Sequence, residues 1–201
     1  MGDVKTRFSI YHITRTIDAK FYKSTFRILI PIIIQNTISN FVSLLDNIMV
    51  GQMGTDQMNA VSISNQLFFV FTLCLWGSLS GAAIFSAQFF GSGDHEGVRD
   101  TFRAKIVFGS IITAAAILVY ITFGKPLISL FLHKTDFIGD IALTSRYART
   151  YMLTMLVGLV PFAVSMSYSN TLRSIGETKL PMKASVTAVF VNLILNITEI
   201  G

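Results

Sequence analysis

The residue best suited to chemistry is Asp46, which lies in the apolar segment 44–50. A carboxylate at the centre of a membrane helix costs about 2.5 to 3.5 kcal/mol on insertion scales. Such a residue normally faces a bundle interior or an aqueous cavity, where it often binds a proton or a cation. The alternative is that the helix leaves the membrane near Leu45, which would put Asp46 at the interface. The apolar residues 48–50 favour the first interpretation because they continue the helix beyond Asp46.

Uncharged polar side chains recur around Asp46 at helical spacing, which puts four of them in one stripe with two more beside it. Interhelical hydrogen bonding accounts for one or two such residues, but seven, with Asp46, favour a face that does not contact lipid. We expect these side chains to line a cavity: Gln35, Asn36, Ser39, Asn40, Ser43 and Asn47. Pro31 removes one backbone hydrogen bond near the start of this helix and predicts a bend that a gate could use.

A second pair of polar residues lies in the last apolar segment. Asn192 and Asn196 are four residues apart, so they project from the same face of a helix. Their carbonyl oxygens suit a hard cation, and their amide groups can donate to a carboxylate such as Asp46. Structural hydrogen bonding between the two amides explains the pair equally well. Contact with Asp46 also requires the two helices to begin at different depths in the membrane.

Enzymatic chemistry has no support in the sequence. The three histidines, His12, His95 and His133, fall in predicted tails or loops without a second ligand at metal-site spacing. No catalytic triad, nucleotide-binding loop or dinucleotide fingerprint is present. We predict no enzyme activity, no cofactor, no nucleic-acid partner and no metal other than a possible Na⁺ at Asp46.

The composition predicts an integral membrane protein. Of the 201 residues, 52% are hydrophobic and 13% are charged, whereas soluble domains carry about 25% charged residues. A membrane helix needs about 20 apolar residues, and the uncharged windows accommodate five of them. We predict an all-α fold, with a cytoplasmic segment 1–26 and a transmembrane region 27–201 whose spans are about 27–50, 57–90, 106–124, 146–172 and 181–199.

The basic residues predict the orientation of these spans, because Lys and Arg are retained in cytoplasmic loops. With five spans, twelve of the sixteen basic residues fall on the side of the N-terminus, among them Arg99, Arg103 and Lys105 in one loop. The other four lie together in the loop after the third span: Lys125, Lys134, Arg146 and Arg149. We therefore predict a cytoplasmic N-terminus.

The count of basic residues also bears on the 37-residue window 57–93, which is long enough to contain a helical hairpin. A hairpin would reverse every later loop and weaken the excess of Lys and Arg on the cytoplasmic side, so we predict one helix. In the loop after the third span, the apolar run 126–132 is too short to cross the membrane. We expect it to lie in the interface or to re-enter.

Several linked motifs resemble the multidrug and toxic compound extrusion (MATE) family of secondary transporters, and they cover most of the chain. Their order and spacing carry the resemblance, since each motif alone is weak. They are Pro31 with Gln35, the sequence DNIMVG at 46–51, Ala60-Val61 with Asn65-Gln66, AQFFGSGD at 87–94 running into Arg99, and LRSIGETKLP at 172–181.

The resemblance implies the N-terminal lobe of a cation-coupled exporter of amphipathic or cationic drugs in the cell membrane. Such proteins have two six-helix lobes with alternating access between them. It also implies that Asp46 binds the coupling H⁺ or Na⁺ with help from polar residues of the fifth span, where Asn192 matches. At the place of Asn196 some members carry a second acid and many bacterial members an amide. Flippases for lipid-linked sugars share the superfamily and rank lower.

The family pattern continues through a sixth helix and a second lobe, whereas this chain stops at Gly201. A second hypothesis therefore stands beside transport. The chain is then a truncated, non-transporting membrane remnant, or a subunit that associates in the bilayer with a second lobe or another copy, because repeat transporters need both repeats.

Overall fold

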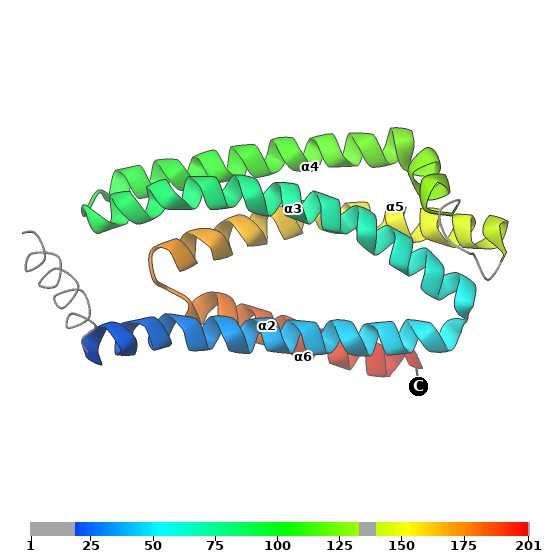
Figure 1. The fold of residues 1–201 in the computed structure, drawn as a ribbon, viewed down its shortest axis with the longest axis horizontal. Helices are drawn as coiled ribbons and strands as arrows, with labels where there is room; N and C mark the ends of the chain where they lie inside the picture. Colours follow the sequence, from blue (N-terminus) through cyan, green and yellow to red (C-terminus); the bar gives the residue numbers. More distant parts are fainter. Residues whose placement is uncertain (1–18, 133–139, 201) are drawn as a thin grey trace, which may run out of the picture. The chain divides into compact units, whose positions relative to one another are not determined.

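The computed structural model describes residues 19–132 and 140–200, with side chains described within 21–132 and 140–194. This part of the chain is helical (Figure 1): α2 Ala19–Met53, α3 Thr55–Gly91, α4 His95–Leu132, α5 Ile141–Ser174 and α6 Lys179–Ile200. Most of the predicted cytoplasmic segment 1–26 lies outside the described residues, since the description begins at residue 19. The predicted all-α membrane fold is confirmed.

Four of these helices, α2 to α5, are long and apolar enough to cross a membrane. Each has 34 to 38 residues, which at 1.5 Å per residue makes roughly 50 Å or more of helix. The hydrocarbon core is about 30 Å thick, so the helices extend past it at one or both ends. The fifth span, expected in α6, and the cytoplasmic N-terminus stay predictions.

The long window 57–93 forms the single helix α3, as the basic-residue count predicts. One residue, Gly54, separates α2 from α3 and has φ +132°. L-residues with a side chain rarely adopt this conformation, which explains a glycine at the turn. A Cβ at Gly54 would also lie 2.7 Å from Gln57 Oε1.

The chain divides into two compact units. The first contains α2 as far as Asn40 together with α6, and the second contains residues 41–176, which are the end of α2 with α3, α4 and α5. Within the first unit, Gln35 in α2 donates a hydrogen bond from Nε2 to Ser185 Oγ in α6. Gln35 and the helix residue Pro31 are both buried there.

The core of the second unit lies where α3, α4 and α5 pack against one another. In α3 the buried apolar residues recur at steps of three or four, which produces one stripe along the helix. Phe68 of α3 meets Phe162 of α5 edge to face, with ring centroids 5.2 Å apart. The buried apolar side chains of α3 are Ala60, Ile63, Leu67, Phe71, Leu75 and Leu79.

Small residues let the three helices approach closely. A Cβ at Gly109 of α4 would lie 3.4 Å from Ser167 Oγ of α5 and 3.6 Å from Leu75 Cδ1 of α3. Gly109 therefore marks a point where all three helices meet. Small residues at helix contacts are typical of membrane bundles, where van der Waals packing replaces the hydrophobic effect between helices.

One end of the second unit is tied together by Asp56, in the first turn of α3. Its Oδ1 accepts hydrogen bonds from the backbone N of Asp140, 3.0 Å away, and from Thr144 Oγ1, 3.1 Å away. Asp140 in turn caps α5, because its Oδ1 accepts from the backbone N of Ala142 and Leu143. Asp56 therefore joins the start of α3 to the start of α5.

Lys105 corrects one sequence prediction. Its charge placed it in a loop, whereas the structure places it within α4 with no solvent exposure. Its Nζ donates a hydrogen bond to Thr171 Oγ1 of α5 at 3.2 Å. The long aliphatic stem of lysine packs among apolar neighbours, so its charge does not by itself mark a helix end.

The apolar run 126–132 is a second correction, because it continues α4 instead of forming a loop segment. Ile128 and Leu132 are buried in the core of the unit. Figure 1 shows that α4 changes direction towards its C-terminal end, and Pro126 lies six residues before that end. A proline removes one backbone hydrogen bond and bends a helix without ending it.

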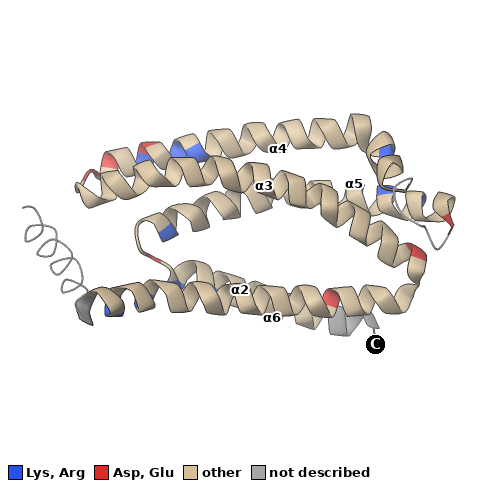
Figure 2. Ribbon diagram, viewed as in Figure 1, with Lys and Arg blue, Asp and Glu red and all other residues tan. Residues whose placement is uncertain are grey.

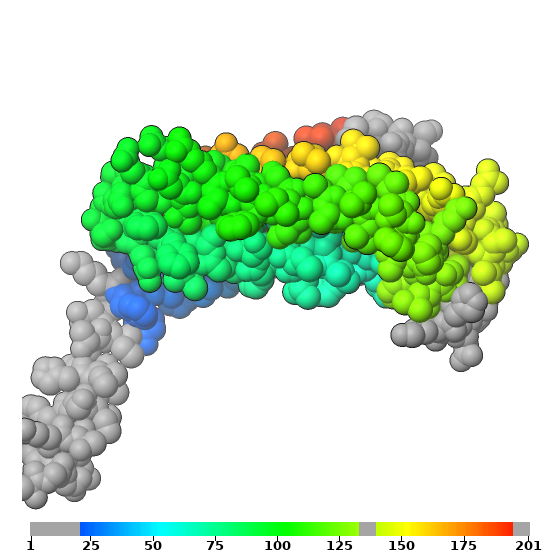
Figure 3. Space-filling model, turned by 90° about the horizontal axis from the view of Figure 1, so that it is seen from above, coloured from blue at the N-terminus to red at the C-terminus, as the bar shows by residue number. Residues whose placement is uncertain are grey.

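The outer surface of the second unit is apolar in the middle and charged at the ends. In the space-filling view α4, in green, lies at the surface along its length (Figure 3), and it exposes Leu118, Ile121 and Phe123. Figure 2 shows that the charged residues of these helices gather at their ends. This distribution suits helices whose middle contacts lipid.

Candidate functional site: the polar face of α2

Asp46 lies in α2 within the second unit and is partly buried. Its carboxylate interacts electrostatically with the phenol of Tyr151 in α5. The predicted coupling acid therefore lies within electrostatic range of a second polar group.

The rest of the predicted polar face differs from the core helices in its exposure. Gln35 is buried and donates a hydrogen bond to Ser185, so it links α2 to α6 within the first unit. The five remaining polar side chains are exposed to the surroundings: Asn36, Ser39, Asn40, Ser43 and Asn47. Exposed amides and hydroxyls on a membrane helix do not suit contact with lipid. Their assignment to a cavity stays a prediction.

The amides of α6 belong to the first unit. Asn192 lies in α6 and is partly buried. Asn196 falls within the same helix, but its side chain lies outside the described residues. Asp46 belongs to the second unit, so the predicted joint site of Asp46, Asn192 and Asn196 stays a prediction. Pro31 lies inside α2, and its predicted bend likewise stays a prediction.

No feature of the sequence indicates that Tyr151 of α5 interacts with Asp46. Tyr147, four residues before Tyr151 on α5, is exposed to a similar extent. Asp46 and Tyr151 are 105 positions apart in sequence. No local pattern signals an electrostatic interaction between them, because it depends on the tertiary structure.

Sequence reasoning also missed two hydrogen-bond acceptors. Ser185 accepts from Gln35, and Asp56 accepts from the start of α5. Asp56 carries a local signal, because an acid in the first turn of a helix is favourable there. That signal predicts a contribution to α3 and gives no indication of the second helix it joins.

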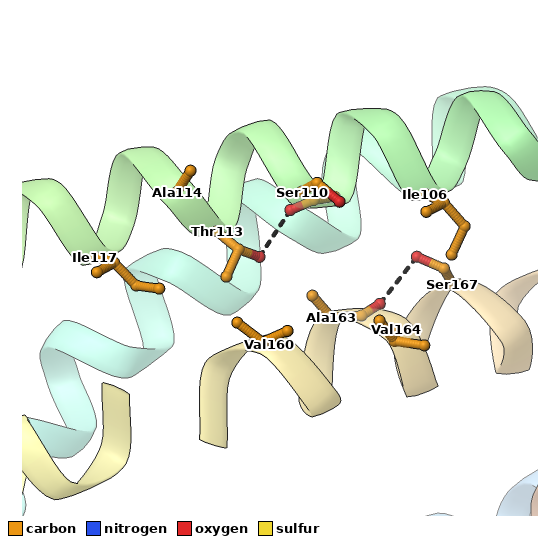
Figure 4. Close-up of a pocket in the computed structure, with 10 residues that line it drawn as sticks. Ile106, Ser110, Thr113, Ala114, Ile117, Val160, Ala163, Val164 and Ser167 are labelled. Atoms are coloured by element: carbon orange, nitrogen blue, oxygen red, sulfur yellow. Dashed lines mark hydrogen bonds between the residues drawn. The ribbon is translucent and has the colours of Figure 1, made fainter. Parts of the chain in front are cut away.

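A metal cluster is not part of the described region, where no group of three or more His, Cys, Asp or Glu could hold an ion. One cavity of about 160 Å³ lies between α4 and α5 (Figure 4). Two of its hydroxyls already donate within their own helices, from Thr113 to the Gly109 carbonyl and from Ser167 to the Ala163 carbonyl. Its walls therefore offer few free donors to a polar ligand.

Comparison with known proteins gives consistent results. Residues 31–198 match the sequence model of the MatE family. The chain is 25% identical over 174 residues to a probable multidrug resistance protein NorM from Thermotoga maritima, covering 87% of this chain and 36% of that protein. A protein of the same name from Bacillus licheniformis is 26% identical, with 84% of this chain and 36% of that protein covered.

A solved structure has the same fold. A MOP superfamily transporter from Pyrococcus furiosus superposes with a TM-score of 0.71 at 22% sequence identity, covering 86% of this chain and 37% of that one. The chain thus spans about a third of the length of the curated relatives it matches. Because the family model covers most of its residues, this chain belongs to the MatE family of membrane transporters, whose motifs it carries.

Proposed function

We propose that the chain forms the cation-coupling lobe of a multidrug exporter in the cell membrane. The exporter exchanges H⁺ or Na⁺ for amphipathic or cationic drugs. The observation that carries the proposal is Asp46, a partly buried carboxylate in a long, largely apolar helix, which interacts electrostatically with Tyr151 of α5. Membership of the MatE family and the names of the relatives support it.

Asp46 acts as the switch in this proposal. The ionised carboxylate is costly at membrane depth, and binding of a proton or Na⁺ removes its net charge. The neutral form then favours one packing of the helices and the charged form another. The ion shifts this equilibrium only by its difference in affinity for the two states. Asn192 and Asn196 supply carbonyl oxygens or amide donors to the same site.

The exposed polar side chains of α2 form the substrate path in this proposal. Amide and hydroxyl groups offer hydrogen bonds without fixing one partner, which suits a pathway that accepts different amphipathic molecules. Asn36, Asn40 and Asn47 are exposed in the structure. A cationic drug gains from the ionised Asp46 nearby, so drug and coupling ion compete for one negative charge.

The proposal concerns part of a transport pathway, since the chain spans about a third of the length of the curated relatives. Transporters built from repeats place the substrate site between two lobes. We propose that this lobe operates together with a second one. The competing possibility, a lobe that does not transport, predicts no efflux in any combination.

The test is ethidium efflux from cells that produce the chain alone or together with the C-terminal lobe of a relative. We expect Asp46→Asn to abolish cation-driven efflux and to leave membrane insertion intact. The matched control is Asp100→Asn, the same chemical change at an exposed acid paired with Arg103, which should keep full efflux. Efflux retained in Asp46→Asn would contradict the coupling role, and no efflux with either arrangement would favour the non-transporting lobe.

A further inference from the structure

Three basic residues converge on one pocket at the junction of α4 and α5. Lys125 comes from the last two turns of α4, and Arg146 and Arg149 come from the first turns of α5. The pocket has a volume of about 670 Å³ and lies wholly within the second unit. All three side chains are exposed, so their charged groups are accessible to a ligand.

The positive charges of this pocket are not balanced by acids within the described residues. No Asp or Glu of the described region lines the pocket. The ion pairs of that region, Arg99 with Glu96 and Arg103 with Asp100, lie at the opposite end of α4. Asp140 caps α5 and keeps its charge, but it is not among the residues that line the pocket. Three like charges around one pocket repel one another unless an anion joins them.

The same residues are exceptions to the charge bias of the chain. Four basic residues fall on the predicted non-cytoplasmic side, and three of them line this pocket. The fourth, Lys134, lies outside the described residues. Membrane proteins place few Lys and Arg on that side. A common anionic ligand would explain why three basic residues on this side of the membrane lie around one pocket.

The hydroxyl groups around the pocket contribute little to recognition. Ser129 Oγ donates to the Pro126 carbonyl at 2.8 Å, and Thr150 Oγ1 donates to the Arg146 carbonyl at 3.1 Å. Ser145 adds a third, partly buried hydroxyl. Recognition therefore depends on the cations, and the planar guanidinium groups of Arg146 and Arg149 match two oxygens of a phosphate.

The surroundings of the pocket have the character of a membrane interface. Both helices that form it are long and apolar enough to span the bilayer. Large apolar side chains lie exposed beside the basic residues, including Leu130, Ile141 and Leu153. Tyr147 is exposed on the same turns of α5, and tyrosines concentrate at headgroup depth. A ligand here meets cations and apolar surface together.

We propose that this pocket binds the phosphate headgroup of an anionic phospholipid, with the acyl chains lying along the exposed apolar side chains of α4 and α5. A soluble phosphate has the same charged group but gains nothing from the apolar surface. No described residue of α2 lines the pocket, so this inference stands or falls without the proposed function.

The test is native mass spectrometry of the full 201-residue chain in micelles that contain equal amounts of phosphatidylglycerol and phosphatidylcholine. We expect the wild-type chain to retain phosphatidylglycerol preferentially. Arg146→Gln with Arg149→Gln should lower this preference by roughly fivefold for each charge removed. The matched control is Arg99→Gln with Arg103→Gln, which removes two arginines from the other end of the bundle and should leave the preference unchanged.

Two further measurements keep the result interpretable. Arg146→Lys with Arg149→Lys retains the charge and should retain most of the preference, and unchanged melting in phosphatidylcholine shows that the glutamine variant is folded. If that variant does not fold, Lys125→Gln alone replaces it, with a single fivefold loss expected. Equal loss in the control pair, or displacement of phosphatidylglycerol by millimolar inorganic phosphate, would overturn the proposal.

Discussion

The helices α3, α4 and α5 on one side and α2 on the other carry many uncharged polar residues, but they use them differently. In the three core helices several polar side chains are buried and hydrogen-bonded, although others, such as Asn65 and Gln66, are exposed. Ser64 Oγ donates to the carbonyls of Ala60 and Ala148, and Tyr120 Oη donates to the carbonyl of Leu67 at 2.6 Å. In α2 the polar side chains are mostly exposed: Asn36, Ser39, Asn40, Ser43 and Asn47.

The contrast separates two roles for polar residues in a membrane protein. A buried hydroxyl that bonds a neighbouring helix contributes to stability. An exposed amide contributes little to stability, so its presence on a membrane helix calls for a ligand or a cavity. Substitutions of the buried polar residues in α3 to α5 should therefore change the free energy of unfolding, whereas substitutions of the exposed polar residues of α2 should change transport.

The largest expected effect on stability comes from Gly109→Leu. The side chain would enter the contact between α4, Ser167 of α5 and Leu75 of α3, where a Cβ alone would already lie 3.4 Å from Ser167 Oγ. Overpacking of this kind costs about 3 kcal/mol, measured as the free energy of unfolding in a dodecyl sulfate titration. Gly77→Leu is the control, because a Cβ at Gly77 would meet nothing within 4 Å beyond its chain neighbours and the nearby backbone of its own helix. An equal loss of unfolding free energy in both variants would contradict a close helix contact at Gly109.

Asp56→Ala should have the next largest effect. It removes the acceptor for the backbone N of Asp140 and for Thr144 Oγ1, so two donors at the start of α5 lose their partner. Hydrogen bonds to a charged group are among the stronger ones, and we expect a loss of about 2 kcal/mol. Thr144→Val removes only one of the two bonds and should cost less in the same titration. A larger loss in Thr144→Val would show that Asp56 is not the main contributor.

Tyr120→Phe tests a single bond of the core. Tyr120 is buried, and its hydroxyl donates to the Leu67 carbonyl between α4 and α3. The ring remains in Tyr120→Phe, so the change isolates the hydrogen bond and should cost about 1 kcal/mol. Tyr168→Phe is the control, since Tyr168 is exposed on α5. An unchanged free energy of unfolding in Tyr120→Phe would show that this hydrogen bond does not stabilise the core.

The smallest effect on stability, and the sharpest test of the contrast, comes from a pair of serines. Ser43→Ala on α2 alters an exposed side chain and should change the free energy of unfolding by less than about 0.5 kcal/mol. Ser64→Ala in α3 removes a buried hydroxyl that bonds α5 and should cost more, about 1 kcal/mol. In the efflux assay the order should reverse, with the larger loss in Ser43→Ala. If Ser64→Ala has the larger effect in both assays, exposed polar residues of α2 and buried ones of α3 do not differ in role as argued.

The sequence allowed the fold to be predicted well where apolar length was the deciding signal. The windows between charges predicted the helical segments, including α3 as one helix. The helix ends were less predictable, because charged residues limit the part of a helix that lies in the membrane without ending the helix. For this reason α4 begins at His95 and continues to Leu132, although the predicted span was 106–124.

The candidate site was predictable only in part. An acid in an apolar helix is visible in sequence, so Asp46 and its polar neighbours could be named. Partners on other helices could not be named, because the electrostatic interaction of Asp46 with Tyr151 and the hydrogen bond of Lys105 to Thr171 both depend on the tertiary structure. Lys105 shows the limit of charge counting most clearly. A residue assigned to a loop by its charge lies fully buried between helices.

The hydrogen bonds of Asp56 have a consequence for the order of assembly. Their partners follow Asp56 by 84 and 88 residues, with all of α4 between them. During synthesis α3 enters the membrane first, so the hydrogen bonds of Asp56 in its first turn can form only after the start of α5 has been synthesised. Contacts between residues so far apart in sequence close late, because the intervening chain must be ordered first. The bonds of Asp56 therefore form among the last contacts of the bundle, and their presence marks a completed insertion of α3, α4 and α5.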